Sequence, residues 1–293
     1  MLRYVRASLE DQAKVEEFLR RNQNDRLIKE LGKLLSLTQG GLYLAIDDNG
    51  AIVGTAVLTL PKRHEAYLGQ VQLASPNLDR ETLKEFAAFQ LEEAQKLGAH
   101  IVRATTGDDD ELWASILQEE SQFEPVEKWV VGTFEGYQVP EFPPLEAGPA
   151  WAVDKERIRK FMEPVTDALW AEHDLHIPTS LDDQSLENQF EVGGVAVAPQ
   201  DGRIAVDSLV LYRIRNSESL DIKYFRSDGH YIHQVLDYLW LEARAWGISR
   251  LRVGLSEKTA SQIAEALQVP IQREWAGRIF VHYINRELQT ASI

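Results

Sequence analysis

The two halves of this sequence repeat one order of helix-like and strand-like patterns. Aligning Gly98 with Gly247, an offset of 149 residues, superposes the segment LKEFAAFQLEEAQKLG on IHQVLDYLWLEARAWG. Apolar residues recur at three- and four-residue spacing in both segments, which predicts one buried helix face in each half. The positions are Leu83, Phe86, Ala87, Leu91, Ala94 and Leu97 in the first half, and Ile232, Val235, Leu236, Trp240, Ala243 and Trp246 in the second. The chain is therefore expected to form two similar domains.

The segments around these two helices repeat as well. LYLAIDDNGAIVGTAVLTL and VAVAPQDGRIAVDSLVLYR each predict two strands joined by an Asn-Gly or Asp-Gly turn. After the long helix, HIVRAT and SRLRVG predict a strand, WASIL and IAEAL a short helix, and Trp129 and Trp275 mark final strands. Hairpins combined with a strand-helix-strand crossover predict a mixed α/β sheet with helices on both faces.

One segment interrupts the alternation of helices and strands. Residues 137 to 150, YQVPEFPPLEAGPA, hold four of the eleven prolines. Proline removes a backbone donor and restricts its neighbour, so this composition predicts an extended connection. We expect domains at residues 1–136 and 149–293, joined by a linker at 137–148.

Charge and composition narrow the classes of partner. With 46 acidic and 31 basic residues the formal charge is -15, which repels nucleic acid and favours basic partners. There is no cysteine, so thiolate chemistry is excluded. No apolar run reaches the roughly 20 residues that span a bilayer, and MLRYVRASLEDQ is too charged for a signal peptide. These features predict a cytoplasmic protein that binds neither nucleic acid nor membranes.

Several fragments and their order resemble a known family. VRA precedes an acidic ED at the start of the first helix, followed by YLAIDDNGAIVGTAVL and LWASILQEESQF. Together they are similar to the acyltransferase fold of the GNAT superfamily, the acetyl-CoA-dependent N-acetyltransferases, present here as a tandem pair. The resemblance implies two GNAT-like domains and acetyl-CoA as co-substrate, without a metal.

The family binds the CoA pyrophosphate on the loop before the long helix, with the motif R/Q-x-x-G-x-G/A. Glycine allows close approach of the backbone, and helix N-terminal N–H groups take the charge. In the first half, SPNLDRETLKEF has no glycine at the motif positions and Asp79 suits a helix cap, so the first domain is expected to have a degenerate loop that does not hold CoA in the family's manner. In the second half, Arg226 and Gly229 keep two motif positions, so the resemblance predicts that Arg226, Ser227, Gly229 and Tyr231 bind the cofactor. The alternative is that Asp228 caps the helix and Gly229 forms a turn.

Many family members use a tyrosine on the short helix as general acid. Gln118 and Gln268 occupy that position in the two halves, and a primary amide cannot donate such a proton. Candidate bases are Glu65 and Tyr67, and Asp221 and Tyr224, on the strands expected to flank the cleft. The alternative for each pair is a solvated edge charge and a packed tyrosine.

The acceptor wall of the family corresponds to WAEHDLHIP, where Trp170 and His173 are expected to line the pocket. His173 and His176 have ligand-like spacing, but two histidines without a third ligand do not predict a metal site. The acidic run at residues 108–111 precedes a short helix and is better explained as a cap.

Three functions remain open. The first is an acyltransferase that transfers an acetyl or acyl group from acyl-CoA to a small, basic amine or a peptide amine. The second is a catalytically inactive binding protein that uses the V-shaped clefts between splayed strands for another ligand. The third is a structural or regulatory protein in which one degenerate domain forms a homodimer face. The architecture and the half-kept second motif place the acyltransferase first.

Overall fold

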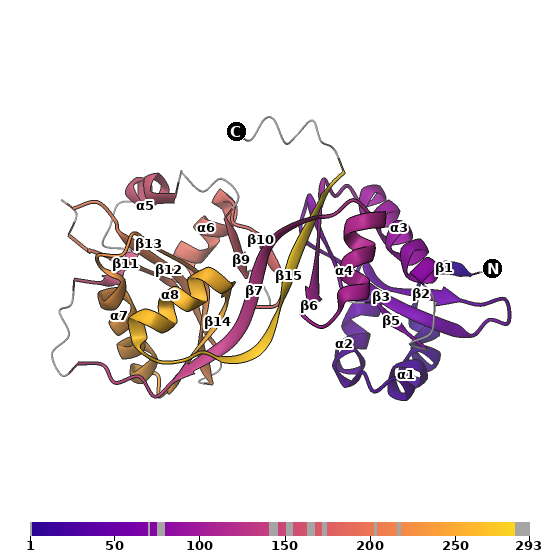
Figure 1. Ribbon diagram of the computed structural model, residues 1–293, viewed down its shortest axis with the longest axis horizontal. Helices are drawn as coiled ribbons and strands as arrows, with labels where there is room; N and C mark the ends of the chain where they lie inside the picture. The colour runs from indigo at the N-terminus through magenta and orange to yellow at the C-terminus, as the bar shows by residue number, and fades with distance from the viewer. Residues whose placement is uncertain are drawn as a thin grey trace. The chain divides into compact units, whose positions relative to one another are not determined.

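The computed structural model describes residues 2–69, 71–74, 80–140, 146–150, 155–162, 168–171, 175–201, 204–215 and 218–284. The chain divides into two compact units (Figure 1). Within the described residues, the first unit comprises 2–126 and 278–284, and the second unit comprises 127–277. Each unit contains a mixed sheet with helices on both faces, as the repeat predicts, and the second unit also contains a separate two-stranded sheet.

The first unit has the strand order β1-β2-β3-β4-β6-β15, and β4 and β6 run parallel. Helices α1 and α2 cover one face of this sheet over Ala7, Leu42 and Leu44, and α3 and α4 cover the other over Tyr43, Ala45 and Ala56 (Figure 1). Its elements are β1 (Arg3–Arg6), η1 (Leu9–Asp11), α1 (Gln12–Arg21), α2 (Asp25–Ser36), β2 (Gly41–Ile46), β3 (Ile52–Lys62), β4 (Glu65–Leu68), β5 (Gln72–Leu73), α3 (Arg80–Lys96), β6 (Ile101–Gly107), α4 (Glu111–Ser115) and the π-helical turn η2 (Ile116–Glu120).

The second unit has the strand order β8-β11-β12-β13-β14-β7-β15, and β13 and β14 run parallel. Helices α7 and α8 pack on one face around Val235 and Ile263, and α5 and α6 pack on the other around Ile158 and Leu186. Its elements are β8 (Gly148–Pro149), α5 (Lys155–Met162), β9 (Leu169–Ala171), β10 (Pro178–Ser180), α6 (Asp183–Glu191), β11 (Val195–Ala198), β12 (Ser208–Arg215), β13 (Ser219–Ser227), α7 (Ile232–Ala245), β14 (Arg250–Ser256) and α8 (Glu257–Leu267).

Strands β7 (Glu124–Glu135) and β15 (Gln272–Tyr283) each pass from one unit into the other. Phe134 of β7 is buried in the core of the second unit, where β7 pairs with β14. Phe280 of β15 is buried in the core of the first unit. Each core therefore contains a strand from the other half of the sequence, and the units divide inside β7 and β15 rather than at residues 136 and 149.

The described parts of the expected linker pack onto the second unit. The Tyr137 hydroxyl donates to Asp237 Oδ1 of α7 at 2.6 Å, and its ring lies 5.9 Å from that of Trp240. Ala147 is buried in the same core, and β8 pairs with β11. These apolar and aromatic side chains gain more from burial than from an extended, solvated path.

The repeated helix face is confirmed for most of its positions. Leu83, Phe86, Ala87 and Ala94 are buried in α3, and the corresponding face of α7 is buried from Ile232 to Ala243. Trp246 was expected on this face but is 59% exposed, because α7 ends at Ala245 and Trp246 is its C-cap. The cap expected at residues 108–111 is present, since Asp110 Oδ1 accepts the Trp113 N–H at 3.1 Å.

Candidate functional site

The parallel strands of the second unit separate along their length. β13 and β14 pair at three positions, of which Ile222 and Val253 form the last. β13 then continues to Ser227 and β14 to Ser256 without further pairing between them. This is the splayed arrangement that the resemblance predicts, and it brings the candidate residues of β13 to one place.

A bulge in β13 decides which side chains share its face. The β12 pairing skips Lys223, because Tyr212 pairs with Ile222 and Leu211 with Tyr224. Ile222 and Phe225 consequently face the α7 core, and Tyr224 faces the α5 and α6 core. Asp221 and Tyr224 are three residues apart, so in a regular strand their side chains would lie on opposite faces. The bulge at Lys223 adds one residue, and both side chains therefore lie on the same face of the sheet.

Asp221 is a buried carboxylate. It accepts a hydrogen bond from Ser219 Oγ at 2.6 Å. Burial raises its pKa, and the hydrogen bond and the charges of Arg252, Arg215 and Arg213 oppose that shift. A raised pKa makes a carboxylate a better proton acceptor, which is compatible with the predicted role as base.

Tyr224 and Trp170 lie together in the core beneath α5 and α6. Both are buried, and burial raises the pKa of Tyr224 although Arg226 lowers it. The Lys223 ammonium lies 4.2 Å from the centre of the Trp170 ring. The predicted acceptor residue Trp170 thus contacts β13, while His173 lies outside the described residues.

Arg226 faces α5. Its guanidinium carbon lies 4.5 Å from the centre of the Phe161 ring, and its Nη1 is buried without a hydrogen-bond partner in the described structure. The neighbouring residue, Phe225, faces the opposite core with α7. The Arg226 side chain is therefore stacked on an aromatic ring, on the other side of the sheet from the helix that would face a phosphate.

The loop from Ser227 to Tyr231 has its N–H groups bound within the chain. Asp207, at the start of β12, accepts Tyr231 N–H at 2.9 Å and His230 N–H at 3.4 Å through its carboxylate, and Asp228 N–H at 2.9 Å through its backbone oxygen. Gly229 N–H donates to Ser227 Oγ at 3.0 Å. A pyrophosphate bound to this loop would have to displace these acceptors from the N–H groups.

The segment after β9 also approaches the separated strands. A Cβ placed on Gly254, the first β14 residue after the last parallel pair, would lie 2.5 Å from Leu175 O. The Trp129 indole N–H donates to the same oxygen at 2.8 Å. Leu175 is therefore fixed against β14 at the point where the strands part, which narrows the space available to a ligand in this unit.

The parallel strands of the first unit separate in the same way. β4 and β6 pair from Glu65 with Ile101 to Leu68 with Ala104. The chain then turns towards β3, where Gly69 N–H donates to Val57 O at 2.7 Å, while β6 continues to Gly107. The end of β6 is thus left without a β4 neighbour.

Glu65 and Tyr67 share a face of β4, as alternation predicts. Glu65 is 4% exposed and forms a buried ion pair with Arg103 of β6. The Tyr67 hydroxyl is hydrogen-bonded to Thr105, which lies on β6 like Arg103. The candidate bases of this unit are therefore buried and paired.

Two buried polar atoms lie on the other face of the same region. Alternation from Val102 and Ala104 places Thr106 on the α3 and α4 face of β6. Thr106 Oγ1 and the Trp113 Nε1 of α4 are buried and have no hydrogen-bond partner in the part of the chain described. Buried polar groups without a partner are uncommon and call for a ligand, a water or another explanation.

The first turns of α3 carry two basic side chains, Arg80 and Lys84, and both are paired with glutamates. Arg80 lies 2.5 Å from Glu119 and 3.6 Å from Glu120, and Lys84 lies 3.3 Å from Glu120. The preceding loop, with Asp79, lies outside the described residues. Two cations at a helix N-terminus suit phosphate groups, which would compete with these exposed ion pairs.

Neither glutamine at the general-acid position acquires a catalytic contact. Gln118 is exposed on η2, and Gln268 is the left-handed C-cap of α8, donating to Glu265 O at 2.7 Å.

His176 packs edge-on against Trp275, with 5.5 Å between the ring centres. The described residues contain no group of three or more histidine or acidic side chains that could hold a metal, and no described helix has the length and apolar character needed to cross a membrane.

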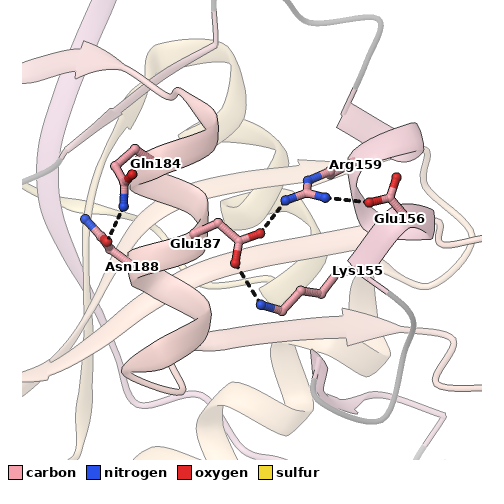
Figure 2. Close-up of polar contacts among 6 residues, drawn as sticks. All are labelled: Lys155, Glu156, Arg159, Gln184, Glu187 and Asn188. Carbon is pink, nitrogen blue, oxygen red and sulfur yellow. Dashed lines mark hydrogen bonds and ion pairs between the residues drawn. The ribbon is translucent and has the colours of Figure 1, made fainter.

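An ion-pair network joins the two helices above Tyr224 and Trp170. Glu187 of α6 accepts Lys155 Nζ at 2.7 Å and also binds Arg159 of α5 (Figure 2). Arg159 lies 2.5 Å from Glu156, and Gln184 donates to Asn188 at 2.9 Å. The hydrogen bond from Lys155 lowers the pKa of Glu187, so the network holds α5 and α6 together while Glu187 is ionised.

Sequence reasoning missed three residues of these sites: Asp207, Arg103 and Lys223. HIVRAT is predicted only as a strand, and nothing in the sequence pairs its arginine, Arg103, with Glu65. Asp207 lies twenty-four residues before Tyr231, and only the pairing of β12 with β13 brings them together.

No known family model matches this sequence, and no curated protein is significantly similar to it. Solved structures are similar in fold. A GCN5-related N-acetyltransferase from Sphaerobacter thermophilus matches with a TM-score of 0.61 at 12% identity, over 97% of this chain and 96% of that one. A tandem GNAT protein from the clavulanic acid biosynthesis pathway matches with a TM-score of 0.52 at 15% identity, over 97% and 99%. A putative acetyltransferase from Pyrococcus horikoshii gives 0.53 at 11% identity, over 97% and 90%.

Proposed function

Since this chain has the tandem GNAT fold over its whole length, we propose that it is an acyl-CoA-dependent N-acyltransferase whose first unit holds the acyl-CoA. The observation that carries this proposal is the parting of β4 and β6 beside Thr106 Oγ1 and Trp113 Nε1, two buried polar atoms that have no hydrogen-bond partner among the described residues. A bound ligand would supply the hydrogen bonds that these atoms lack.

Charge supports the first unit over the second. Arg80 and Lys84 stand at the start of α3, where they would meet phosphate groups. In the second unit the corresponding helix start meets the carboxylate of Asp207 instead. When bound, acyl-CoA supplies an acyl group activated as a thioester.

The chain's own residues supply the surroundings. Glu65 and Arg103 neutralise each other at the junction of β4 and β6, and we propose that this pair positions the strands. Asp221, whose raised pKa suits a proton acceptor, lies in the second unit and is therefore not assigned to the acyl-CoA held by the first unit. A small-molecule or peptide amine of basic character, attracted by the charge of -15, is the proposed acceptor, and the cytoplasm the proposed location.

The location of the cofactor can be tested with one matched pair of variants. Thr106→Val removes the partnerless hydroxyl with little change in shape, and Thr55→Val does the same at another buried, partnerless threonine, on the α1 and α2 face of the sheet. We expect acetyl-CoA and CoA to raise the unfolding midpoint of the wild type and of Thr55→Val, and to raise that of Thr106→Val several-fold less.

Two results would contradict the proposal. If neither compound shifts the midpoint of the wild type at millimolar concentration, the acyl-CoA function should be abandoned. If Thr106→Val responds as the wild type does, the ligand does not lie at the end of β6.

A second function, binding without turnover, is favoured by Gln118 and Gln268 at the general-acid position. Release of CoA separates the two. The chain has no cysteine, so a thiol reagent added to protein, acetyl-CoA and an amine mixture reports only free CoA. Binding of acetyl-CoA without amine-dependent release of thiol would favour the second function.

A further inference from the structure

The loop that leads into α7 has its backbone N–H groups bound within the chain, two of them by a carboxylate. The carboxylate of Asp207 accepts the N–H groups of His230 and Tyr231, and its backbone oxygen accepts that of Asp228. Ser227 Oγ accepts the N–H of Gly229. Four successive N–H groups, from residue 228 to residue 231, thus have partners within the chain, in the segment where the resemblance predicts the pyrophosphate.

Asp207 is held firmly in this position. Its side chain is 8% exposed, and Ser208 Oγ donates to its Oδ1 at 2.8 Å. Ser208 Oγ is also hydrogen-bonded to Ser227 Oγ at 2.7 Å, and Ser208 pairs with Ser227 across β12 and β13. Moving Asp207 aside would break bonds at both ends of this loop.

The surrounding charges disfavour a second anion. The negative charge of Glu146 is the main cause of the raised pKa of Tyr231, and Asp207 adds to it. The cation expected to help, Arg226, is stacked on Phe161 on the other face of β13. A pyrophosphate placed here would meet two carboxylates without the compensating guanidinium.

We propose that Asp207 is a built-in substitute for the phosphate at the start of α7, so that the second unit does not bind CoA and each chain binds one CoA rather than two. The residue closes this loop in the way a bound anion would, because its carboxylate accepts the N–H groups of His230 and Tyr231 directly before the helix. The stoichiometry rests on the proposed function, whereas the closure of the loop does not.

The closure predicts a gain of binding when Asp207 is removed. We would label glycine, histidine and tyrosine with ¹⁵N and follow the amide signals of Gly229, His230 and Tyr231 during titration with CoA and with inorganic pyrophosphate. In the wild type we expect these signals to stay in place at millimolar concentration. In Asp207→Ala we expect the His230 and Tyr231 signals to shift with pyrophosphate in a saturable manner, with an apparent affinity at least ten-fold above that of the wild type.

Two further variants keep this test decisive. Asp228→Ala removes an equal charge from an exposed side chain of the same loop and should leave the titration unchanged. Asp207→Asn keeps an oxygen for Tyr231 N–H, so it should remain folded and bind pyrophosphate more weakly than Asp207→Ala. Movement of the wild-type signals with CoA would overturn the proposal, and so would Asp207 variants that fold but bind no pyrophosphate.

The outcome is separable from that of the proposed function. If acetyl-CoA raises the unfolding midpoint while the amide signals of Gly229, His230 and Tyr231 stay in place, both proposals are supported. If these amide signals stay in place and acetyl-CoA does not raise the unfolding midpoint, the acyl-CoA function is rejected but the proposed closure of the loop by Asp207 still stands.

Discussion

At the scale of single residues, Glu65 and Arg103 form a buried ion pair in which each charge is balanced only by the presence of the other. Each side chain is about 5% exposed. Removal of one partner would leave the other as an isolated charge in a place that water does not reach, which costs far more than the pair itself contributes.

We therefore predict that Glu65→Gln lowers the free energy of unfolding by about 3 to 5 kcal/mol. The double variant Glu65→Leu, Arg103→Met should regain most of that loss, because neither buried charge remains. Denaturant unfolding of the three proteins checks both statements. A double variant less stable than Glu65→Gln would show that the pair is needed for a reason other than charge balance.

At the scale of elements, α5 and α6 depend on Glu187 for their connection (Figure 2). Its folded pKa lies below the ordinary value of about 4.3, so its ionised form stabilises the folded state. That stabilisation is present above the unfolded pKa and is lost as the pH falls through the folded pKa.

Glu187→Gln should therefore lower the unfolding midpoint at pH 7, and the difference from the wild type should shrink as the pH falls below about 4. Glu191→Gln, at an exposed position near the end of the same helix, is the matched control and should have little effect at either pH. The midpoints measured from pH 7 to pH 2 decide this. A difference for Glu187→Gln that persists unchanged at pH 2 would exclude an ionic origin.

The elements are also the scale at which sequence reasoning works best. The apolar spacing of α3 and α7 predicted their buried faces, and Asn-Gly predicted the turn between β2 and β3, because these signals are local. The prediction for Trp246 is wrong because the apolar spacing continues one residue past the end of the helix. Partners that come from distant strands, such as Asp207 with Tyr231 and Glu65 with Arg103, have no local signal.

The bulge at Lys223 is another feature that has no local signal in the sequence. Counting along a regular strand places Asp221 and Tyr224 on opposite faces, and only the skipped pairing with β12 reunites them. The candidate residues could be named from sequence, but their burial and their partners required the sheet register.

At the scale of the whole molecule, each unit needs residues from both halves of the chain. Phe280 is completely buried among core residues of the first unit, and Phe134 among those of the second. The two compact units therefore do not coincide with the two halves of the sequence repeat.

We predict that Phe280→Ala destabilises the first unit by about 3 to 5 kcal/mol although it lies near the other end of the sequence. Hydrogen exchange should show lower protection in α3 for Phe280→Ala and lower protection in α7 for Phe134→Ala. The opposite assignment would show that β7 and β15 do not cross between the units.

The crossing of β15 also bears on synthesis at the ribosome. The main segment of the first unit ends at residue 126, yet its last strand segment begins at residue 278, a difference of 278 − 126 = 152 residues. At about 5 to 20 residues per second, that strand arrives roughly 8 to 30 s later. During this interval the edge of β6 that β15 covers in the finished structure waits for its neighbouring strand, so Phe280 reaches the core of the first unit only after residues 127–277 have been made.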